Sequence, residues 1–270
     1  MGDMDHCQFF RGKKITAMGL GLLGRGIGDI AYLSECGAEL IVTDLKNEVE
    51  LAPALSELKT YSNITYHLGG HKMEDFRDRD MILKAAGVPL DSEFIEEAEA
   101  RNIPIEMSAA LVAKLTGATI VGVTGTRGKS TVTHLIHNIL QGLDRKVFLG
   151  GNVRGIATLP ILREVTKDDI VVMELDSWQL QGFGAAKISP QVSVFTSFYP
   201  DHMNYYHDSM QLYFDDKANI FRHQTESDVL FVTPEVRSAI EKYNGGIPPA
   251  NMKMTDAVAF NNRSLMGVHN

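Results

Sequence analysis

The fold of this chain is decided by a glycine-rich stretch near its middle, Gly122-Val123-Thr124-Gly125-Thr126-Arg127-Gly128-Lys129-Ser130-Thr131. The stretch fits the pattern G-x-x-x-x-G-K-S/T. An apolar run at 118–121 precedes it, and apolar residues at spacings of three and four follow it. Strand, glycine-rich turn and helix form the context of a phosphate-binding P-loop. We therefore predict an α/β unit of the P-loop ATPase type over residues 117–270.

The residue types of this stretch suit a bound phosphate. Glycines let backbone N–H groups point inward at an anion, and the N-terminus of the following helix adds a partial positive charge. Lys129 would reach the outer phosphates, and the Ser130 hydroxyl would sit on Mg²⁺. The alternative is a glycine-rich turn that binds nothing, but the agreement of motif and context favours a phosphate site.

Length and composition limit the possible classes of protein. The chain has 270 residues, 44% of them hydrophobic, and a net charge of −8, which suits one large domain or two of ordinary size. No run of Lys or Arg indicates a nucleic-acid partner. No apolar run is long enough for a membrane span and no signal peptide is recognisable, so we expect a cytoplasmic protein with no membrane partner. Cys7 and Cys36 fit no metal-binding or C-x-x-C spacing, so we expect ordinary thiols in a reducing compartment.

A second glycine pattern lies near the start of the chain. Residues 19–24 read G-x-G-x-x-G after a predicted strand at 14–18, and a further strand at 39–43 leads to Asp44. A βαβ unit with an acid about 20 residues after the glycines is typical of a nucleotide-binding, Rossmann-like fold, which we predict for residues 1–116. Three interpretations stay open. Asp44 could bind the ribose of NAD or another nucleotide edge, or the glycines could serve only close helix–sheet packing.

Polar residues also follow the predicted strands of the second segment. A glycine-rich turn at 150–155 follows one strand, and Glu174 ends the next. An acid at the end of a core strand beside a P-loop is the usual carboxylate for bound Mg²⁺, and Asp176 could face the same way. His202 lies with acids after a further strand. Taken alone, Lys217 reads as a surface lysine.

Several motifs in one order resemble the Mur ligase family, ATP-dependent ligases that build the peptide stem of peptidoglycan. The resemblance covers nearly the whole chain. It rests on the P-loop at 122–131, the G-G-N turn at 150–152, residues 174–180 against E-L-S-S-F-Q-L, residues 201–203 against D-H-L/M-D, residues 213–217 against Y-x-x-x-K, and residues 265–270 against the start of G-x-H-N-x-x-N. The E-L-S-S-F-Q-L pattern is a signature of the branch that adds D-glutamate.

The resemblance implies roles for individual residues. It assigns the phosphates and adenine of ATP to Gly125, Thr126, Arg127, Gly128, Lys129, Ser130, Thr131 and Asn270. It makes Lys129, Glu174, His202 and Lys217 the catalytic residues, with Mg²⁺ held by Ser130, Glu174, His202 and Lys217. Lys217 would act as a carbamate, because carbamylation turns a cation into an anionic oxygen ligand. The UDP-muramoyl substrate is assigned to Gly21, Leu22, Leu23, Gly24, Asp44, Asn152 and Gln179, so the first segment would bind a UDP-sugar and not NAD.

The implied reaction has two steps. The carboxylate of UDP-N-acetylmuramoyl-L-alanine attacks the γ-phosphate of ATP and gives an acyl phosphate. The amine of an amino acid, D-glutamate by the resemblance, then displaces phosphate and forms an amide. Lys129 and two Mg²⁺ ions would offset the charge on the transferred group. We expect the protein to be a monomer.

The chain also departs from the family. The family's S-P-G turn stands here as Ala85-Ala86-Gly87 after Lys84, and Asp176 and Ser197 stand where Ser and Asn are usual. The family's third domain, which binds the incoming amino acid, does not follow within the 270 residues. We therefore expect a fragment that binds the UDP-sugar and ATP without completing ligation. The alternatives are a non-catalytic protein that binds nucleotide-sugar and ATP, and an NAD-linked enzyme.

Overall fold

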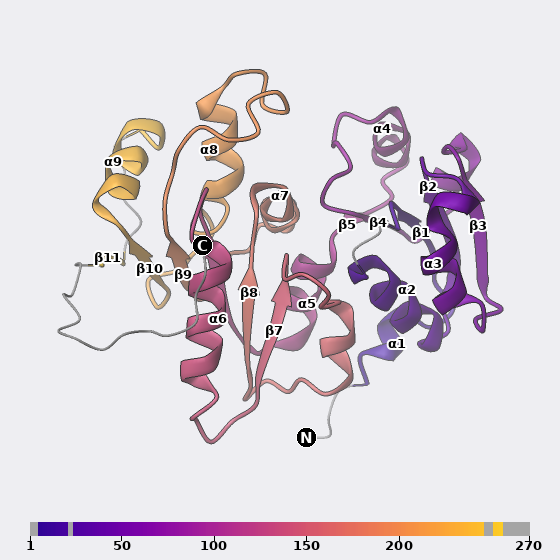
Figure 1. Cartoon of the computed structure of the whole chain (residues 1–270), viewed down its shortest axis with the longest axis horizontal. Coiled ribbons are helices and arrows are strands. Elements are labelled where there is room, and N and C mark those ends of the chain that lie inside the picture. Colours follow the sequence, from indigo (N-terminus) through magenta and orange to yellow (C-terminus); the bar gives the residue numbers. More distant parts are fainter. Residues whose placement is uncertain (1–4, 21–23, 246–250, 256–270) are drawn as a thin grey trace.

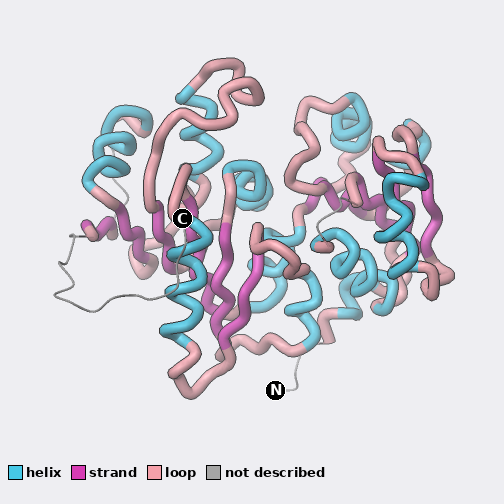
Figure 2. Tube along the Cα trace, in the orientation of Figure 1, coloured by secondary structure: helices cyan, strands magenta, loops and turns pink. Residues whose placement is uncertain are grey.

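The chain forms two parallel α/β units that lie side by side (Figure 1). The structure is a computed structural model and describes residues 5–20, 24–245 and 251–255. In each unit the strands form a central layer with helices against it (Figure 2). The predicted fold class, a Rossmann-like unit followed by a P-loop-type unit, is confirmed.

The first unit contains a parallel sheet with the strand order β3-β2-β1-β4-β5 among the described residues. The order places β1 at the centre, with β2 and β4 on its two sides. Its elements are α1 (Cys7–Phe10), β1 (Lys14–Met18), α2 (Arg25–Glu35), β2 (Glu39–Asp44), α3 (Glu48–Leu58), β3 (Ile64–Leu68), η1 (Met73–Phe76), β4 (Met81–Lys84), α4 (Glu93–Ala100) and β5 (Ile105–Glu106).

The second unit contains a parallel sheet with the order β11-β10-β9-β6-β8-β7. Its elements are α5 (Ser108–Thr116), β6 (Thr119–Thr124), α6 (Lys129–Leu140), β7 (Val147–Gly151), η2 (Leu159–Arg163), β8 (Ile170–Glu174), α7 (Ser177–Ala186), β9 (Val192–Phe195), α8 (Met210–Ala218), β10 (Val229–Val232), α9 (Pro234–Tyr243) and β11 (Met252–Met254). The strand expected at 257–260 and the motif at 265–270 lie outside the described residues. The carboxyl ends of β6, β8 and β9 share one edge, which is where parallel α/β sheets bind ligands.

Helices α2 and α5 lie between the two sheets (Figure 1). Helix α5 packs against η2 and α7 of the second unit, and α2 also contacts η2. One apolar cluster continues across this junction and includes Leu33, Leu111 and Leu162. The division of the chain at 116/117 stays a prediction, since α5 ends at Thr116 and is grouped here with the second unit only because it packs against η2 and α7.

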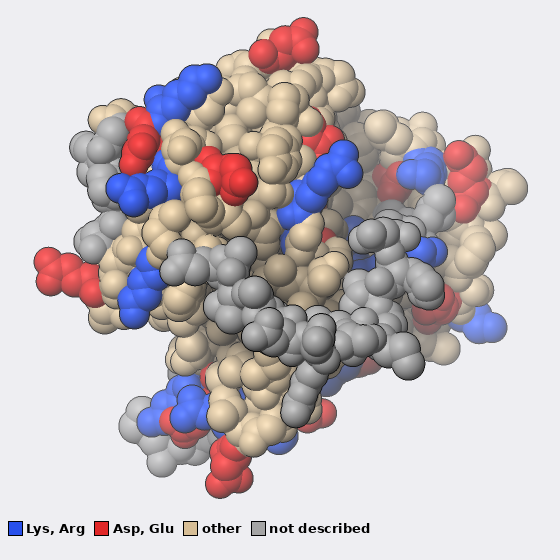
Figure 3. All heavy atoms as spheres, turned by 60° about the vertical axis from the view of Figure 1, so that its left-hand side comes forward, with Lys and Arg blue, Asp and Glu red and all other residues tan. Residues whose placement is uncertain are grey.

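The surface carries charges of both signs. On the face in Figure 3 the basic and acidic side chains are interspersed over the described residues. Within the described part of the chain, no helix combines the length and the apolar character needed to cross a membrane.

The expectation of two free thiols is wrong. Cys7 in α1 and Cys36 at the end of α2 form a disulfide, with their Cα atoms 4.7 Å apart. The pairing follows from packing, because Phe10 of α1 contacts the Tyr32 ring of α2 at 5.9 Å between ring centroids. The residues are 29 positions apart, and nothing in their spacing announces the contact.

We expect loss of this bond to weaken the fold. A disulfide closing a loop of this length contributes about 2–4 kcal/mol, largely by restricting the unfolded chain. Urea unfolding of Cys36→Ser should therefore give a lower midpoint than the oxidised wild type. Reductant should lower the wild-type midpoint toward that of the variant and leave the variant unchanged. Equal midpoints for oxidised and reduced wild type would contradict the expectation.

Candidate functional site

The P-loop joins β6 to α6 with a backbone that only glycine adopts readily. Gly125 has φ +147°, and a Cβ there would overlap Thr196 Oγ1 and lie 2.9 Å from the Ser197 nitrogen. Gly128 has φ +84° and forms the N-cap of α6, which begins at Lys129. The helix N-terminus therefore faces the carboxyl edge of the sheet, as anion binding requires.

Ser197 explains one departure from the family pattern. Its hydroxyl accepts from the Arg127 nitrogen at 2.8 Å and donates to the Arg127 oxygen at 2.9 Å. Its backbone oxygen accepts from the Thr126 nitrogen at 2.9 Å. The segment after β9 thus holds the first half of the P-loop, and Arg127 itself is exposed.

Two lysines meet at the end of β6. Lys129 Nζ donates to the Gly125 oxygen at 2.9 Å, and Lys217 Nζ donates to the same oxygen at 3.2 Å. Lys217 is 1% exposed, so the surface-lysine interpretation is wrong. Burial lowers the pKa of Lys217 to about 7, and the charge of Lys129 lowers it further in the same direction. A neutral amine is the form that reacts with CO₂, so this environment suits a carbamate.

Glu174 ends β8 between the P-loop strand and the glycine turn. Its Cα pairs with Val123 on one side and Gly151 on the other. The residue is 5% exposed, and its carboxylate accepts no hydrogen bond from another described residue. A carboxylate in a largely buried place is costly unless water, a cation or a hydrogen-bond donor meets it. Carboxylate and hydroxyl oxygens are the hard ligands that Mg²⁺ prefers. Glu174 offers the first kind, and Ser130, which follows Lys129, offers the second.

Asp176 has a local role instead. It is the N-cap of α7 and accepts from the Gln179 nitrogen at 2.8 Å. The acid that replaces the family's serine therefore serves as a helix cap, as Asp and Ser both do.

His202 lies in the loop after β9, next to the motif that follows β8. Its ring centroid is 4.7 Å from that of Trp178, and its Nε2 is 3.5 Å from Asp201 Oδ2. The backbone at His202 has φ +53°. Among the described residues, no three His, Cys, Asp or Glu side chains converge closely enough to hold a metal ion. The predicted metal set of Ser130, Glu174, His202 and Lys217 therefore stays a prediction.

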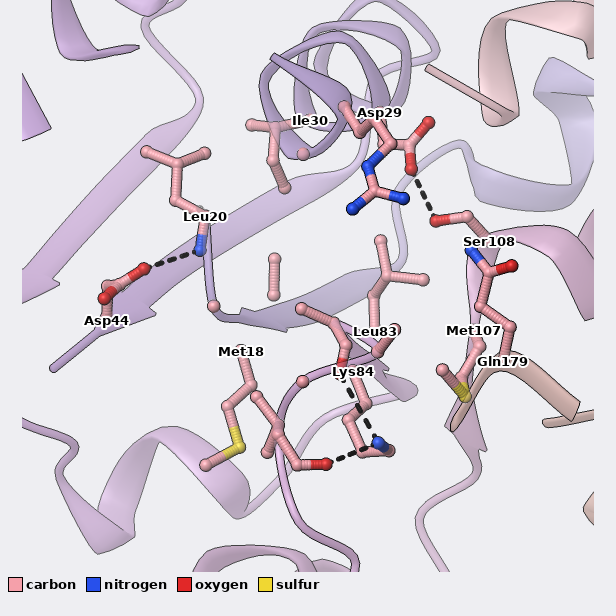
Figure 4. Close-up of a pocket in the computed structure, with 18 of the residues that line it drawn as sticks. Met18, Leu20, Asp29, Ile30, Asp44, Leu83, Lys84, Met107, Ser108 and Gln179 are labelled. Atoms are coloured by element: carbon pink, nitrogen blue, oxygen red, sulfur yellow. Dashed lines mark hydrogen bonds between the residues drawn. The ribbon is translucent and has the colours of Figure 1, made fainter. Parts of the chain in front are cut away.

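A cavity of about 720 Å³ lies between the two units (Figure 4). The first unit supplies the ends of β1 and β4, the start of α2 and the turn at 84–89, and the second unit supplies Gly151, Thr158 and Gln179. Of the predicted substrate residues, Asp44 and Gln179 line it. The Gln179 Oε1 atom is buried without a hydrogen-bond partner, which leaves an acceptor for a ligand.

The remaining predicted substrate residues lie around this cavity or outside the described parts. Asn152 follows Gly151 and donates its backbone N–H to the Glu174 oxygen at 2.7 Å. Gly24 is the N-cap of α2, with φ +80°. Gly21, Leu22, Leu23 and Asn270 lie outside the described residues.

Asp44 joins the loops that follow β1 and β2. Its carboxylate accepts from the Leu20 nitrogen at 2.9 Å, drawn in Figure 4, and from the Lys46 nitrogen at 2.9 Å. The acid at this place therefore also shapes the wall of the cavity.

Sequence reasoning missed two buried charged residues of the cavity wall. Lys84 is 2% exposed and donates to the Val88 oxygen at 2.6 Å, so it holds the Ala-Ala-Gly turn that replaces S-P-G. Burial lowers the pKa of Lys84 to about 8. Asp29 of α2 accepts from Ser108 Oγ at 2.5 Å, and the two side chains face each other in Figure 4. A lone Lys at a strand end and a lone Asp in a helix give no signal that separates them from surface residues.

We expect Asp29 to make stability depend on pH. Burial raises the pKa of Asp29 from 3.8 to about 6, against the lowering effects of its hydrogen bonds and of the Arg25 charge. The native state thus keeps a proton that the unfolded chain releases, so the contribution is full below about pH 3.8 and is lost as the pH rises through about 6. This difference in pKa between the native and unfolded states changes the free energy of unfolding by roughly 3 kcal/mol.

Urea unfolding of the wild type and Asp29→Asn between pH 4 and pH 7 tests this expectation. The amide cannot titrate, so Asp29→Asn should gain stability relative to the wild type as the pH rises. Parallel stability curves would show that Asp29 has the same pKa in both states.

Two family models match the chain in succession. The model "Mur ligase MurD-like, N-terminal domain" matches residues 13–106, and the model "Mur ligase middle domain" matches residues 123–251. Together they cover most of both sheets and all but the first residue of the P-loop.

Relatives and solved structures agree with these models. The chain is 36% identical over 219 residues to UDP-N-acetylmuramoylalanine–D-glutamate ligase of Roseiflexus sp. (strain RS-1), which covers 81% of this chain and 46% of that protein. It is 34% identical over 284 residues to the ligase of the same name from Clostridioides difficile (strain 630). That match covers 96% of this chain and 61% of that protein. The chain thus spans about half the length of the curated relatives it matches.

Similar folds occur in solved ligases of lower identity. UDP-N-acetylmuramate:L-alanyl-gamma-D-glutamyl-meso-diaminopimelate ligase from Neisseria meningitides has a TM-score of 0.59 at 14% identity, over 90% of this chain and 78% of that one. UDP-N-acetylmuramate-alanine ligase from Thermotoga maritima has a TM-score of 0.51 at 23% identity, over 83% of this chain and 49% of that one. Sequence and fold agree, and the chain belongs to the Mur ligase family, with a MurD-like N-terminal unit followed by the family's middle domain.

Proposed function

We propose that the chain binds UDP-N-acetylmuramoyl-L-alanine and ATP and forms an acyl phosphate, the first step of ligation to D-glutamate in peptidoglycan synthesis. The names of the relatives support the substrates and the amino acid. The proposal includes the division into a UDP-sugar domain at 1–116 and an ATP domain at 117–270, a monomeric state and a cytoplasmic location.

One observation carries the proposal. The Nζ atoms of Lys129 and Lys217 meet on the Gly125 oxygen at the end of β6, and the neighbouring strand β8 ends at Glu174, which is 5% exposed. A phosphate-binding lysine would hold the transferred phosphoryl group, and a carbamylated lysine and a carboxylate would hold the Mg²⁺ that offsets its charge.

The residues of the chain would share the chemistry as follows. Lys129 and the start of α6 hold the transferred phosphoryl group and offset its charge. Ser130, Glu174 and carbamylated Lys217 would hold Mg²⁺, which neutralises charge between the outer phosphates. The substrate carboxylate forms a bond to the γ-phosphorus while the bond to the β-phosphate oxygen breaks, leaving ADP. His202 lies beside Trp178 in the loop after β9 and would be a further ligand of Mg²⁺.

Calorimetric titration with UDP-N-acetylmuramoyl-L-alanine, with NAD as control, tests the binding site. Binding of the UDP-sugar alone is expected. Incubation with ATP, Mg²⁺ and hydroxylamine should then trap the acyl phosphate as a hydroxamate. Binding without hydroxamate would favour a non-catalytic nucleotide-sugar protein, and binding of NAD alone would overturn the proposal.

A further inference from the structure

We propose that Asp29 is a positioning residue that sets the Gly151–Asn152 turn of the second unit against the cavity of the first. The inference rests on the proposed function, because the muramoyl end of the ligand is taken to reach this turn. The role is carried by hydrogen bonds that cross the junction between the units.

The Asp29 carboxylate joins three elements. Its Oδ1 atom accepts from the backbone nitrogens of Thr158 at 3.0 Å and Leu159 at 2.8 Å, at the start of η2. Its Oδ2 atom accepts from Ser108 Oγ at 2.5 Å, at the start of α5. Asp29 is 6% exposed, so water does not compete for these bonds. Hydrogen bonds to a buried charged group are among the stronger ones in proteins.

The backbones approach closely at the same place. A Cβ at Gly28 would lie 2.5 Å from the Ala157 Cβ, so only glycine permits this contact between α2 and the loop before η2. Glu35 and Arg163 add an ion pair at 2.5 Å further along α2 and η2, with about half of each side chain exposed. The junction therefore has a buried contact at Asp29 and an exposed one at Glu35.

The buried contact continues to the glycine turn. The Thr158 hydroxyl accepts from the Gly151 nitrogen at 3.1 Å, and Gly151 pairs with Glu174 across the strands β7 and β8. The next residue, Asn152, bonds through its Oδ1 atom to the Arg25 guanidinium at the start of α2. With its oxygen held by Arg25, the Asn152 amide presents N–H donors to its surroundings.

These contacts do more than hold two domains together. Arg25, Asp29, Ser108, Gly151 and Thr158 all line the cavity. Asp44 and Leu20 lie on another part of the wall, within the first unit. A ligand confined to the first unit should therefore bind independently of Asp29. A ligand that also reaches Asn152 should need it.

Calorimetry with two ligands separates these cases. UDP alone tests the first unit, and UDP-N-acetylmuramoyl-L-alanine tests both units. Asp29→Ala should weaken binding of the second ligand by about 10- to 100-fold, the usual effect of losing hydrogen bonds to a buried charge, and change UDP binding by less than about twofold. Asp29→Asn keeps an oxygen for both backbone donors and an N–H for Ser108, so it should restore near wild-type binding.

Two further variants make the test decisive. Thr158→Val keeps the side-chain shape but loses the bond to Gly151, and it should weaken only the second ligand, by about 3- to 10-fold. It decides the matter if Asp29→Ala does not fold. Glu35→Ala is the matched control, since it breaks the exposed contact between the same helices and should change neither affinity.

The outcomes distinguish the two proposals. Failure of the wild type to bind the UDP-sugar would contradict the proposed function itself. If the wild type binds the UDP-sugar, two results would overturn the positioning role alone. One is that Asp29→Ala and Thr158→Val weaken UDP and the UDP-sugar equally. The other is that Glu35→Ala weakens the UDP-sugar as much as Asp29→Ala does.

Discussion

Replacing Lys217 by methionine is expected to lower hydroxamate formation from ATP and UDP-N-acetylmuramoyl-L-alanine by about 10²–10³-fold, the usual loss when one preorganised electrostatic group is removed from a transition state. Lys217 is 1% exposed and its Nζ is 3.2 Å from the Gly125 oxygen, so its carbamate would lie beside the P-loop. Methionine fills similar volume without a nitrogen to carbamylate. Folding should survive, because the variant removes a buried amine and leaves an apolar chain.

A direct measurement of the carbamate accompanies the rate. Carbon-13 NMR in labelled bicarbonate should show a carbamate signal in the wild type that disappears in Lys217→Met. UDP binding should persist, since Lys217 does not line the cavity between the units. Lys167→Met is the control, because this exposed lysine precedes β8 at the opposite edge of the sheet and should change neither signal nor rate. If Lys217→Met forms hydroxamate at the wild-type rate, Lys217 has no part in the mechanism.

Gly151→Ala is expected to lower the free energy of unfolding by about 2–5 kcal/mol, the sum of a left-handed backbone and an overpacked contact. Gly151 has φ +79°, and a Cβ there would overlap the backbone oxygen of Glu174 and lie 3.0 Å from its carbonyl carbon. Both neighbours are backbone atoms, so neither can move without separating β7 from β8. The strain falls on Glu174, so binding of ATP with Mg²⁺ should weaken as well.

Gly155→Ala is the matched control for this variant. Gly155 has a similar φ of +75°, but a Cβ there meets no atom within 4 Å. It should lose only about 1–2 kcal/mol, from the backbone conformation alone. Urea unfolding of both variants measures the difference. Equal losses would show that the approach of Gly151 to Glu174 relaxes at no cost.

The sequence predicted the two sheets because their signals are local. The P-loop, its strand and its helix lie within residues 118–140, and the glycine motif and apolar spacing of that segment indicate them. The same holds for β1, α2 and β2, whose order and parallel register follow from one βαβ unit. The family motifs then indicated Glu174 at the end of β8, which the strand pattern alone also favoured.

Other parts of the site depend on residues far apart in the sequence. The Asp29 contacts join positions separated by 79 to 130 residues, so no pattern around Asp29 announces them. Lys84 ends strand β4 as the sequence suggests, but only the tertiary structure shows that it is 2% exposed and that its Nζ bonds to the turn that follows. Cys7 and Cys36 fit no motif, and they meet only because α1 packs against α2. Ser197 departs from the family pattern in the sequence, yet its hydroxyl accepts a hydrogen bond from the P-loop residue Arg127 after the neighbouring strand β9.

Neighbouring residues are enough to indicate which segments become strands, which turns need glycine and which family the chemistry resembles. Long-range packing is what buries Lys217 beside Lys129, lets Asp29 bond from α2 to η2 and gives the cavity walls from both units. The reason is physical. Burial depends on which surfaces the packed sheets exclude from water, and the loss of water shifts the pKa values of the buried acids and bases.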